Sequence, residues 1–311
     1  MRAKRMLFGV FLVGMATIAV TTDAASARPA EPSPSRMPSY AEAVSSPDWV
    51  KTPFGLSHKT CTHEVARGGS VDRNGNIVVG RATTVVPRCA YGTIKKPSTA
   101  VQAPTTNGWL KASAWSAPSW FRRLYSDLAV PSAPSVNGAL NYFFSAFEPA
   151  DMTDIIQPVL QWGSNGAFGG NFYTVASWYV IGDGRMFYSS PFTTTPGHTI
   201  YGQMEANTCS STGANCHWAI VATDTTSDKQ TRLDVTAGKS YRLAFGGAFE
   251  SYGASGCNML PANGAARFTN IKIWGPTFNL LTPQFAEWTW DQQCSMYTTM
   301  SSTSTTFGWT P

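Results

Sequence analysis

The chain from residue 109 onward is a series of short segments in which apolar residues alternate with polar ones or run together. Turns containing Gly or Pro, such as residues 182–184 and 196–197, separate these segments. Alternation with period two is typical of β-strands, and many short strands at regular spacing indicate a sandwich or barrel. The segments that stand out cover residues 140–147, 158–162, 172–181, 198–205, 218–223, 240–249 and 266–274.

We therefore predict an all-β fold, a two-sheet antiparallel β-sandwich of the jelly-roll or concanavalin-like kind. A short helical pattern is expected only over residues 119–129. The composition agrees, because only 41 of the 311 residues are charged while 39 are Trp, Tyr or Phe. A coiled coil or helical bundle would be rich in Ala, Glu, Lys and Leu, and a disordered chain would have few aromatic residues.

The N-terminal third divides into segments of different character. Residues 28–48 are rich in Pro, Ser and Ala and indicate a leader or linker. Residues 49–99 suggest a small β unit closed by two cysteines, with a turn signal at Arg73-Asn74-Gly75-Asn76. The polar stretch 95–107 indicates a boundary. We expect four parts: a signal peptide (1–27), the leader (28–48), the small β unit as a possible propeptide (49–99), and the sandwich (100–311).

The first 27 residues have the pattern of a secretory signal. A basic start, the apolar run 6–20 and an Ala-Ser-Ala site before Arg28 are present. The apolar run is short for a membrane span, so an anchor is the weaker alternative. We expect secretion, to the extracellular space or the periplasm, with no membrane partner after signal cleavage.

Six cysteines agree with an oxidising compartment. Six cysteines permit 15 pairings, so the connectivity stays open. Pairing between neighbours in the sequence is the simplest arrangement, namely Cys61–Cys89, Cys209–Cys216 and Cys257–Cys294.

The net charge of +5 is unevenly distributed. Residues 28–99 hold ten Lys or Arg and five Asp or Glu, whereas residues 100–311 hold ten and twelve. The sandwich is therefore slightly acidic and the segment before it is basic. We hypothesise that 28–99 is a propeptide that covers an acidic cleft, is released when carboxylates become protonated, and is cleaved near Lys95-Lys96.

Several chemistries lack their sequence motifs. The chain has no G-x-S-x-G, H-E-x-x-H, Walker or dinucleotide-binding pattern, and no C-x-x-C pair. His198 and His217 stand beside turns and indicate surface positions. The basic residues are scattered rather than grouped in a stripe, which argues against nucleic-acid binding. We expect no metal and no cofactor.

Carboxylate and amide chemistry remains, and two residues attract attention. Glu250 ends an apolar, strand-like segment, where its side chain faces either solvent or the concave face of a sheet. On a concave face, burial would raise its pKa, as a general base requires. Gln161 lies within Val159-Leu160-Gln161-Trp162. Its amide could donate a hydrogen bond to an oxyanion, or it could simply be the polar residue of an alternating strand.

Five segments over about residues 107–275 resemble the glutamic peptidases of the eqolisin type. The order and spacing of the segments carry the resemblance, and no single segment is specific. The segment containing Gln161 is similar to the family's Ile-Leu-Gln-Thr-Gly, and Glu250, 89 positions later, falls where the family has its catalytic Glu. The other segments are Asn107-Gly108-Trp109, Val130-Pro131-Ser132, Ala176-Ser177-Trp178-Tyr179 and Ala266-Arg267-Phe268-Thr269-Asn270.

The resemblance implies a secreted acid endopeptidase that hydrolyses peptide bonds with a Gln/Glu dyad. Gln161 and Glu250 would be catalytic, and Phe147, Asp151, Trp178 and Tyr179 would bind substrate. The partner would be a polypeptide substrate, and a monomer is expected. The sequence departs from the family pattern in three places: Phe147 stands for a Trp, Val180 for a Glu, and residues 209–216 are an insertion.

Two other functions fit the same fold. A non-catalytic sandwich could bind carbohydrate through exposed aromatic rings, which would require a planar row of them. The available tryptophans are Trp109, Trp115, Trp120, Trp162, Trp178, Trp274, Trp288, Trp290 and Trp309. A glycoside hydrolase would require two facing acids about 5–5.5 Å apart in the retaining case, and Glu250 has no acid partner in the E-x-E spacing.

Overall fold

A computed structural model describes residues 37–95 and 105–311. The expected signal peptide, residues 28–36 of the leader and Lys96 lie outside these residues. The regular secondary structure of the described residues is almost entirely β-strand, and the expected all-β sandwich is confirmed. Its helical parts are α1 (Tyr40–Val44) and the 3-10 turns η1 (Lys59–Cys61) and η2 (Cys257–Met259). The expectation of a helix over 119–129 is wrong, because Arg123–Ala129 forms strand β8 between two partner strands.

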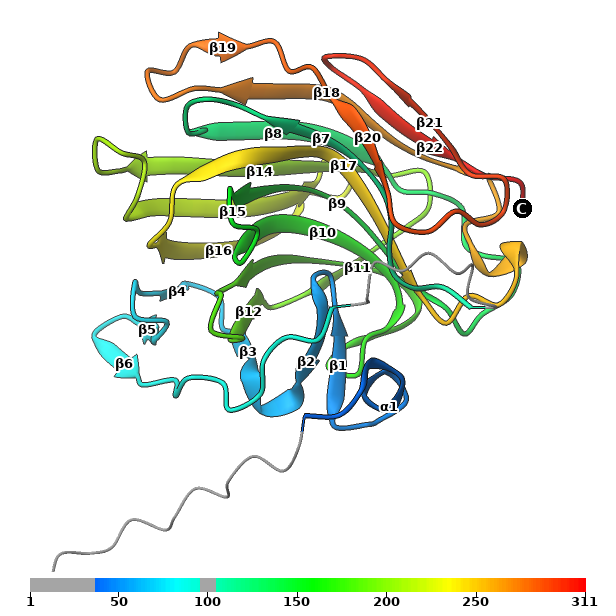
Figure 1. The fold of residues 1–311 in the computed structure, drawn as a ribbon, viewed down its shortest axis with the longest axis horizontal. Helices are drawn as coiled ribbons and strands as arrows, with labels where there is room; N and C mark the ends of the chain where they lie inside the picture. The colour runs from blue at the N-terminus through cyan, green and yellow to red at the C-terminus, as the bar shows by residue number, and fades with distance from the viewer. Residues whose placement is uncertain (1–36, 96–104) are drawn as a thin grey trace, which may run out of the picture. The chain divides into compact units, whose positions relative to one another are not determined.

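Within the described residues, one sheet has nine strands (Figure 1). Its order is β20-β7-β17-β9-β10-β11-β12-β3, and β13 also pairs with β11. The strands are β20 (Ala286–Thr289), β7 (Asn107–Ser116), β17 (Tyr241–Tyr252), β9 (Leu140–Pro149), β10 (Ile155–Ser164), β11 (Gly169–Val180), β12 (Met186–Ser189), β3 (Thr62–Val65) and β13 (Phe192–Thr194).

A second sheet has eleven strands in the described residues. Its order is β21-β22-β18-β8-β14-β15-β16-β4-β5-β6, and β19 also pairs with β18. The strands are β21 (Tyr297–Met300), β22 (Thr305–Gly308), β18 (Ala265–Trp274), β8, β14 (Thr199–Thr208), β15 (Cys216–Asp224), β16 (Lys229–Ala237), β4 (Gly69–Val71), β5 (Ile77–Val79), β6 (Ala82–Thr84) and β19 (Leu280–Leu281).

The nine-stranded sheet buries apolar side chains on both faces. Its inner face packs on the eleven-stranded sheet and contributes Phe143 and Leu160 to the core between the sheets. Its outer face carries a second cluster that includes Phe144 and Trp178. Because successive side chains of a strand point to opposite faces, neighbours such as Phe143 and Phe144 join different clusters.

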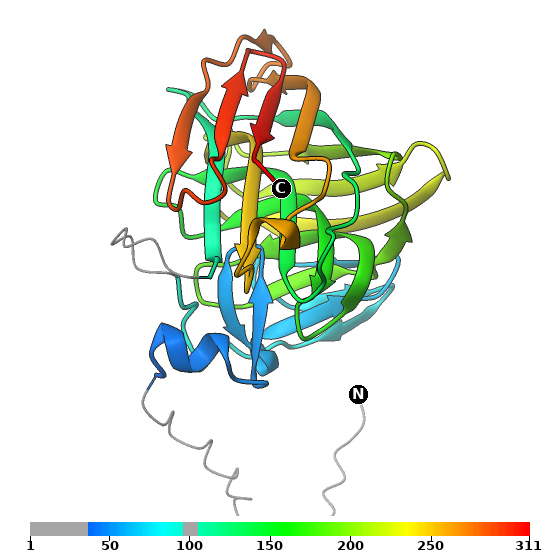
Figure 2. The same cartoon turned by 90° about the vertical axis from the view of Figure 1, so that its right-hand side faces the viewer.

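A separate hairpin, β1 (Trp49–Thr52) and β2 (Gly55–His58), packs against the outer face. Trp49, Phe54 and Leu56 join the outer cluster. The blue hairpin is seen beside the green strands in Figures 1 and 2. Apolar residues on the outer face of this sheet are thus covered by the protein's own N-terminal segment.

The small N-terminal unit also extends both sheets. Strand β3 pairs in parallel with β12, and β4 pairs in parallel with β16. Although most pairs in the sandwich are antiparallel, these two join the segment before residue 100 to both sheets.

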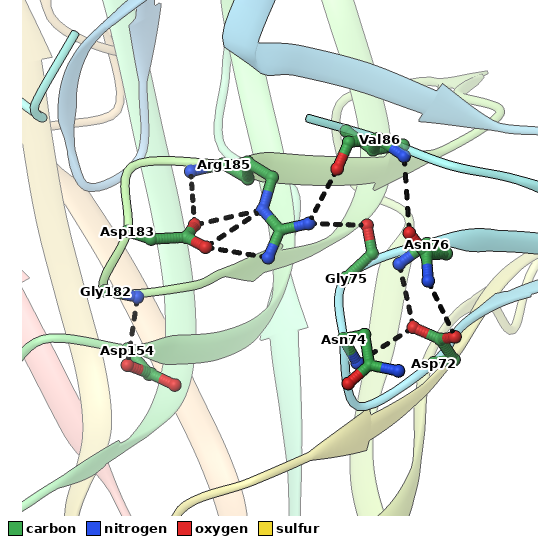
Figure 3. Close-up of polar contacts among 9 residues, drawn as sticks. All are labelled: Asp72, Asn74, Gly75, Asn76, Val86, Asp154, Gly182, Asp183 and Arg185. Atoms are coloured by element: carbon green, nitrogen blue, oxygen red, sulfur yellow. Dashed lines mark hydrogen bonds and ion pairs between the residues drawn. The ribbon is translucent and has the colours of Figure 1, made fainter. Parts of the chain in front are cut away.

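A buried arginine, Arg185, stabilises the turn predicted at residues 73–76 through hydrogen bonds (Figure 3). Arg185 Nη1 donates to the carbonyls of Gly75 and Val86, each at 3.0 Å, and Arg185 also forms an ion pair with Asp183. Gly75 has a φ of +75°, and a Cβ there would lie 2.4 Å from Arg185 Cζ, so this turn requires glycine.

Three disulfides cross-link the described chain: Cys61–Cys89, Cys209–Cys216 and Cys257–Cys294. They are the three local pairs expected from the sequence. Cys61–Cys89 lies wholly inside residues 28–99, and the other two lie wholly inside 100–311. Consequently no disulfide joins the N-terminal segment to the sandwich.

Candidate active site

Glu250 lies near the end of β17 with its side chain on the outer face of the nine-stranded sheet. The residue is fully buried. Tyr252 Oη lies 2.5 Å from Glu250 Oε1, whereas Oε2 has no hydrogen-bond partner among the described residues. Burial raises the pKa of Glu250 well above its usual range, against the hydrogen bond from Tyr252 and the charge of Lys95, which lower it.

Gln161 lies on β10 in the same row of the sheet as Glu250. Gln161 is the register partner of Tyr142 on β9, and Tyr142 is the partner of Glu250 on β17. Side chains of directly paired residues share a face, so all three point to the outer face. Two strand spacings separate the Cα atoms of Gln161 and Glu250 by about 10 Å, with Tyr142 between them.

The Gln161 amide is engaged in the loop that connects β10 and β11. Its Nε2 donates to the carbonyls of Gly163 at 2.8 Å and Phe168 at 3.2 Å. Its Oε1 accepts a hydrogen bond from Asn165 Nδ2 at 3.2 Å. Because an amide group has only two N–H donors, neither is free for another acceptor in this conformation.

A cavity of about 230 Å³ lies beside Glu250 on the same outer face. Residues of strands β7, β9, β17 and β20 and the residue just after β20 line it on one side, and N-terminal residues line it as well. It is lined by Tyr40, Phe54, Gly55, Lys95, Gly108, Trp109, Glu148, Met152, Phe245, Glu250, Tyr252, Trp288 and Trp290. Gln161 is absent from this lining.

The cavity contains a second buried acid, Glu148, which the sequence analysis did not single out. Glu148 is 4% exposed, and burial raises its pKa to about 8, while the charge of Lys95 lowers it. The signal that could have found it is alternation, because Glu148 shares its parity on β9 with Tyr142 and Phe144.

The β1–β2 hairpin accepts hydrogen bonds from side chains of the outer face, including Tyr142 in the row of Glu250 and Gln161. Tyr142 Oη donates to the carbonyl of Lys51 at 2.6 Å, and Tyr252 Oη lies 3.2 Å from the carbonyl of Thr52. Gln157 Nε2 donates to the carbonyl of Pro53 at 2.9 Å. The side chains of the outer face thus hold extended main chain through its carbonyl oxygens.

The four residues expected to bind substrate are placed differently from one another. Trp178 shares the outer face, but it is fully buried against Phe168 and Tyr188. Phe147 and Tyr179 belong to the core between the sheets, on the face opposite Glu250. Asp151 lies at the surface, where Lys239 pairs with it at 3.0 Å. None of the four lines the cavity beside Glu250.

The geometry required by the two rival functions differs from what is observed. The tryptophans in the cavity meet at steep angles, 61° for Trp109 and Trp290 and 67° for Trp288 and Trp290, rather than in a planar row. The two acids, Glu148 and Glu250, are far apart. Glu148 lies six positions along β9 from Tyr142, the register partner of Glu250, which corresponds to about 20 Å between Cα atoms.

No family model matches the chain, and no curated protein gives a significant match. Among solved structures it is similar to scytalido-glutamic peptidase bound to a peptide-based transition state analog, with 14% identity over 65% of this chain and 98% of the other, at a TM-score of 0.46. It is also similar to SCP-B, an eqolisin-family peptidase in complex with the tripeptide Ala-Ile-His (15% identity, 65% and 98% coverage, TM-score 0.44).

A third similar structure is aspergilloglutamic peptidase from Aspergillus niger, with 14% identity over 56% of this chain and 99% of the other, at a TM-score of 0.35.

Proposed function

We propose that this protein is a secreted acid endopeptidase in which Glu250 activates water and the Gln161 amide stabilises the oxyanion. The observation that carries the proposal is the shared row: both residues lie on one face of one sheet, in register with Tyr142. The hydrogen bonds that this face makes to main-chain carbonyls of the β1–β2 hairpin add support, because a polypeptide substrate presents the same carbonyl groups.

The proposed reaction uses no group beyond the chain and water. Ionised Glu250 takes a proton from water as the water oxygen bonds to the scissile carbonyl carbon, and Gln161 Nε2 donates a hydrogen bond to the resulting oxyanion. The oxyanion then collapses, the C–N bond breaks, and the proton on Glu250 passes to the leaving amine nitrogen. Peptide bond and water are converted into acid and amine.

The conformation described is a covered one, and two changes must precede this reaction. The hairpin must leave the row of Glu250, which hydrates the carboxyl and lowers its pKa so that it can ionise. The β10–β11 loop must also release one N–H of Gln161 from Gly163 or Phe168. Activity is then expected to fall at low pH as the uncovered Glu250 becomes protonated.

We propose further that residues 28–99 are the propeptide and that cleavage near Lys95-Lys96 releases them. The absence of a disulfide between this segment and the sandwich permits release. Release must break the pairings of β3 and β4 and the contacts of Arg185. The mature protein would act as a monomer on polypeptides outside the cell.

The decisive experiment measures digestion of denatured casein by the purified secreted protein over a series of pH values. Glu250→Gln and Gln161→Ala should each abolish digestion, with circular dichroism showing retained β-structure. Glu205→Gln, on the opposite sheet, is the matched control and should digest casein like the wild type. Digestion by either site variant would refute the dyad, and mass spectrometry showing an active protein that still begins at Arg28 would refute the propeptide.

A further inference from the structure

The two carboxyl oxygens of Glu250 have different surroundings. Oε1 lies 2.5 Å from Tyr252 Oη, whereas Oε2 has no hydrogen-bond partner among the described residues. Glu250 also lines the cavity of about 230 Å³, which is large enough for water. The two oxygens are therefore not equivalent, and Oε2 is the one that can meet a water molecule.

Tyr252 is fixed on the same face of β17 as Glu250. The two residues are two positions apart, and alternate residues of a strand share a face. Tyr252 is 1% exposed, and its ring meets that of Tyr142 at 90° with the centroids 6.5 Å apart. Because packing on all sides holds the ring, the hydroxyl is held in one place beside the Glu250 carboxyl.

The Tyr252 hydroxyl has one proton and two acceptors within reach. Its Oη lies 2.5 Å from Glu250 Oε1 and 3.2 Å from the carbonyl oxygen of Thr52 in the β1–β2 hairpin. A hydroxyl donates one hydrogen bond, so its proton serves one of these acceptors at a time. When it serves Thr52, the proton between Oη and Oε1 belongs to Glu250, which must then be protonated. When the hairpin leaves, the Tyr252 proton becomes available to an ionised Glu250.

Tyr252 can act on Glu250 as a hydrogen-bond donor but not as a base. Burial raises the pKa of Tyr252 well above its usual range, and the charge of Glu250 raises it further. The hydroxyl therefore keeps its proton at the pH values at which a carboxyl titrates. Burial raises the pKa of Glu250, and the hydrogen bond from Tyr252 lowers it because it stabilises the ionised form.

Three other groups face Glu250 from neighbouring elements: Lys95, Tyr142 on β9 and Tyr40 on α1. The charge of Lys95 lowers the pKa of Glu250. Burial raises the pKa of both tyrosines, so they are neutral, and their hydroxyls donate to main-chain carbonyls instead. Of the described side chains, Tyr252 is thus the one that donates a hydrogen bond to the Glu250 carboxyl.

We propose that Tyr252 is the positioning residue of Glu250: its hydroxyl holds Oε1, so that Oε2 takes the proton from water, and it favours the ionised carboxylate once the hairpin has left. The inference rests on the proposed peptidase function, in which Glu250 is the base. In the step concerned, one O–H bond of water breaks, its proton goes to Oε2 and its oxygen bonds to the scissile carbonyl carbon. The O–H bond of Tyr252 stays intact throughout.

Infrared spectroscopy of the full chain tests this contact without relying on catalysis. The difference between the wild type and Glu250→Gln isolates the carboxyl band of Glu250, and the same difference in a Tyr252→Phe background isolates that band without the hydroxyl. We expect the band at higher frequency in Tyr252→Phe, because a hydrogen bond is lost, and ionisation of Glu250 about one pH unit higher. Tyr142→Phe is the matched control and should change neither. Tyr252→Met, which also lacks a donor, is used if circular dichroism shows that Tyr252→Phe is unfolded.

A second measurement follows kcat/KM for a peptide over a series of pH values with the purified secreted protein. The acid limb of this profile reports the ionisation of the base in the free enzyme. We expect the limb to move up by about one pH unit in Tyr252→Phe and to stay in place in Tyr142→Phe. A merely structural role of Tyr252 would lower kcat/KM by the same factor at every pH and leave the limb where it is.

The two measurements separate failure of this inference from failure of the peptidase. If the infrared shifts occur but no peptide is cleaved at any pH, the peptidase proposal fails and the control of Glu250 by Tyr252 stands. If peptides are cleaved while the acid limb and the infrared band are the same in the wild type and Tyr252→Phe, the peptidase stands and the positioning role is overturned.

Discussion

Replacing Glu148 by Gln should change how the stability of the fold depends on pH. Burial raises the pKa of Glu148 to about 8, against 4.5 for an ordinary glutamate. The folded state therefore keeps this proton to a higher pH than the unfolded state does. Below pH 4.5, Glu148 does not reduce the free energy of unfolding. As the pH rises from 4.5 toward 8, Glu148 lowers this free energy progressively, and above pH 8 the reduction stays constant.

The magnitude follows from the two pKa values. A difference of about 3.5 pH units, at about 1.4 kcal/mol per unit, gives a loss of up to about 5 kcal/mol for a side chain that is almost fully buried. Gln has the same shape as Glu and stays neutral at every pH. Between pH 4.5 and pH 9, the free energy of unfolding should therefore fall by several kcal/mol less in the Glu148→Gln variant than in the wild type.

The measurement is urea unfolding of both proteins at several pH values from 4.5 to 9, comparing the change in unfolding free energy rather than its absolute value. The raised pKa of Glu250 contributes equally to both proteins and cancels. In Glu205, burial raises the pKa, but hydrogen bonds from Arg123, Tyr125 and Gln203 outweigh it and lower the pKa overall. Glu205→Gln should therefore follow the wild type above pH 5. Parallel curves for the wild type and Glu148→Gln, within about 1 kcal/mol, would refute the reasoning.

Three further changes probe the site and the core. Tyr252→Phe removes the hydroxyl beside Glu250 and Thr52. It should lower the free energy of unfolding in urea by about 1–3 kcal/mol, because it leaves buried acceptors unpaired. An unchanged unfolding midpoint would contradict this. Gly169→Ala places a Cβ 2.4 Å from Gln161 Nε2 at a φ of +98°. It should lower the free energy of unfolding by about 1–3 kcal/mol and reduce casein digestion. The control Gly238→Ala, with open space around the added Cβ, should change neither stability nor digestion. Phe147→Ala should lower the free energy of unfolding by about 3–5 kcal/mol but leave KM for peptides unchanged, because Phe147 lies in the core between the sheets. A raised KM at unchanged stability would instead place Phe147 at the substrate.

Much of the architecture could be predicted from the chain itself. Period-two alternation and frequent turns indicated the all-β sandwich, and the predicted strand at 140–147 lies within β9. The turn at 73–76 was also identified, because Asn-Gly favours tight turns. Local patterns sufficed here because strand and turn propensities act over a few residues.

The pairing partners of the strands could not be predicted from such local patterns. The N-terminal segment was expected as a separate unit before the sandwich, yet β3 and β4 extend its two sheets. Parallel pairs join residues far apart in sequence and leave no turn signal between them. The 119–129 segment was mistaken for a helix for a related reason, since its strand conformation depends on pairing with β14 and β18.

The candidate site shows most clearly which features the sequence determines and which depend on tertiary structure. The sequence by itself determined that Glu250 is a carboxylate within an apolar strand, and that Gln161 is an amide within another. Which face each occupies was decided by tertiary structure, because the pairing of β17 with β7 shifts register between Phe245 and Gly247, where β17 has one extra residue. Simple alternation from Phe245 would place Glu250 with the core between the sheets. The irregular register instead turns it to the outer face, into the row of Gln161 and the cavity with Glu148, and only the pairing of three strands could specify that.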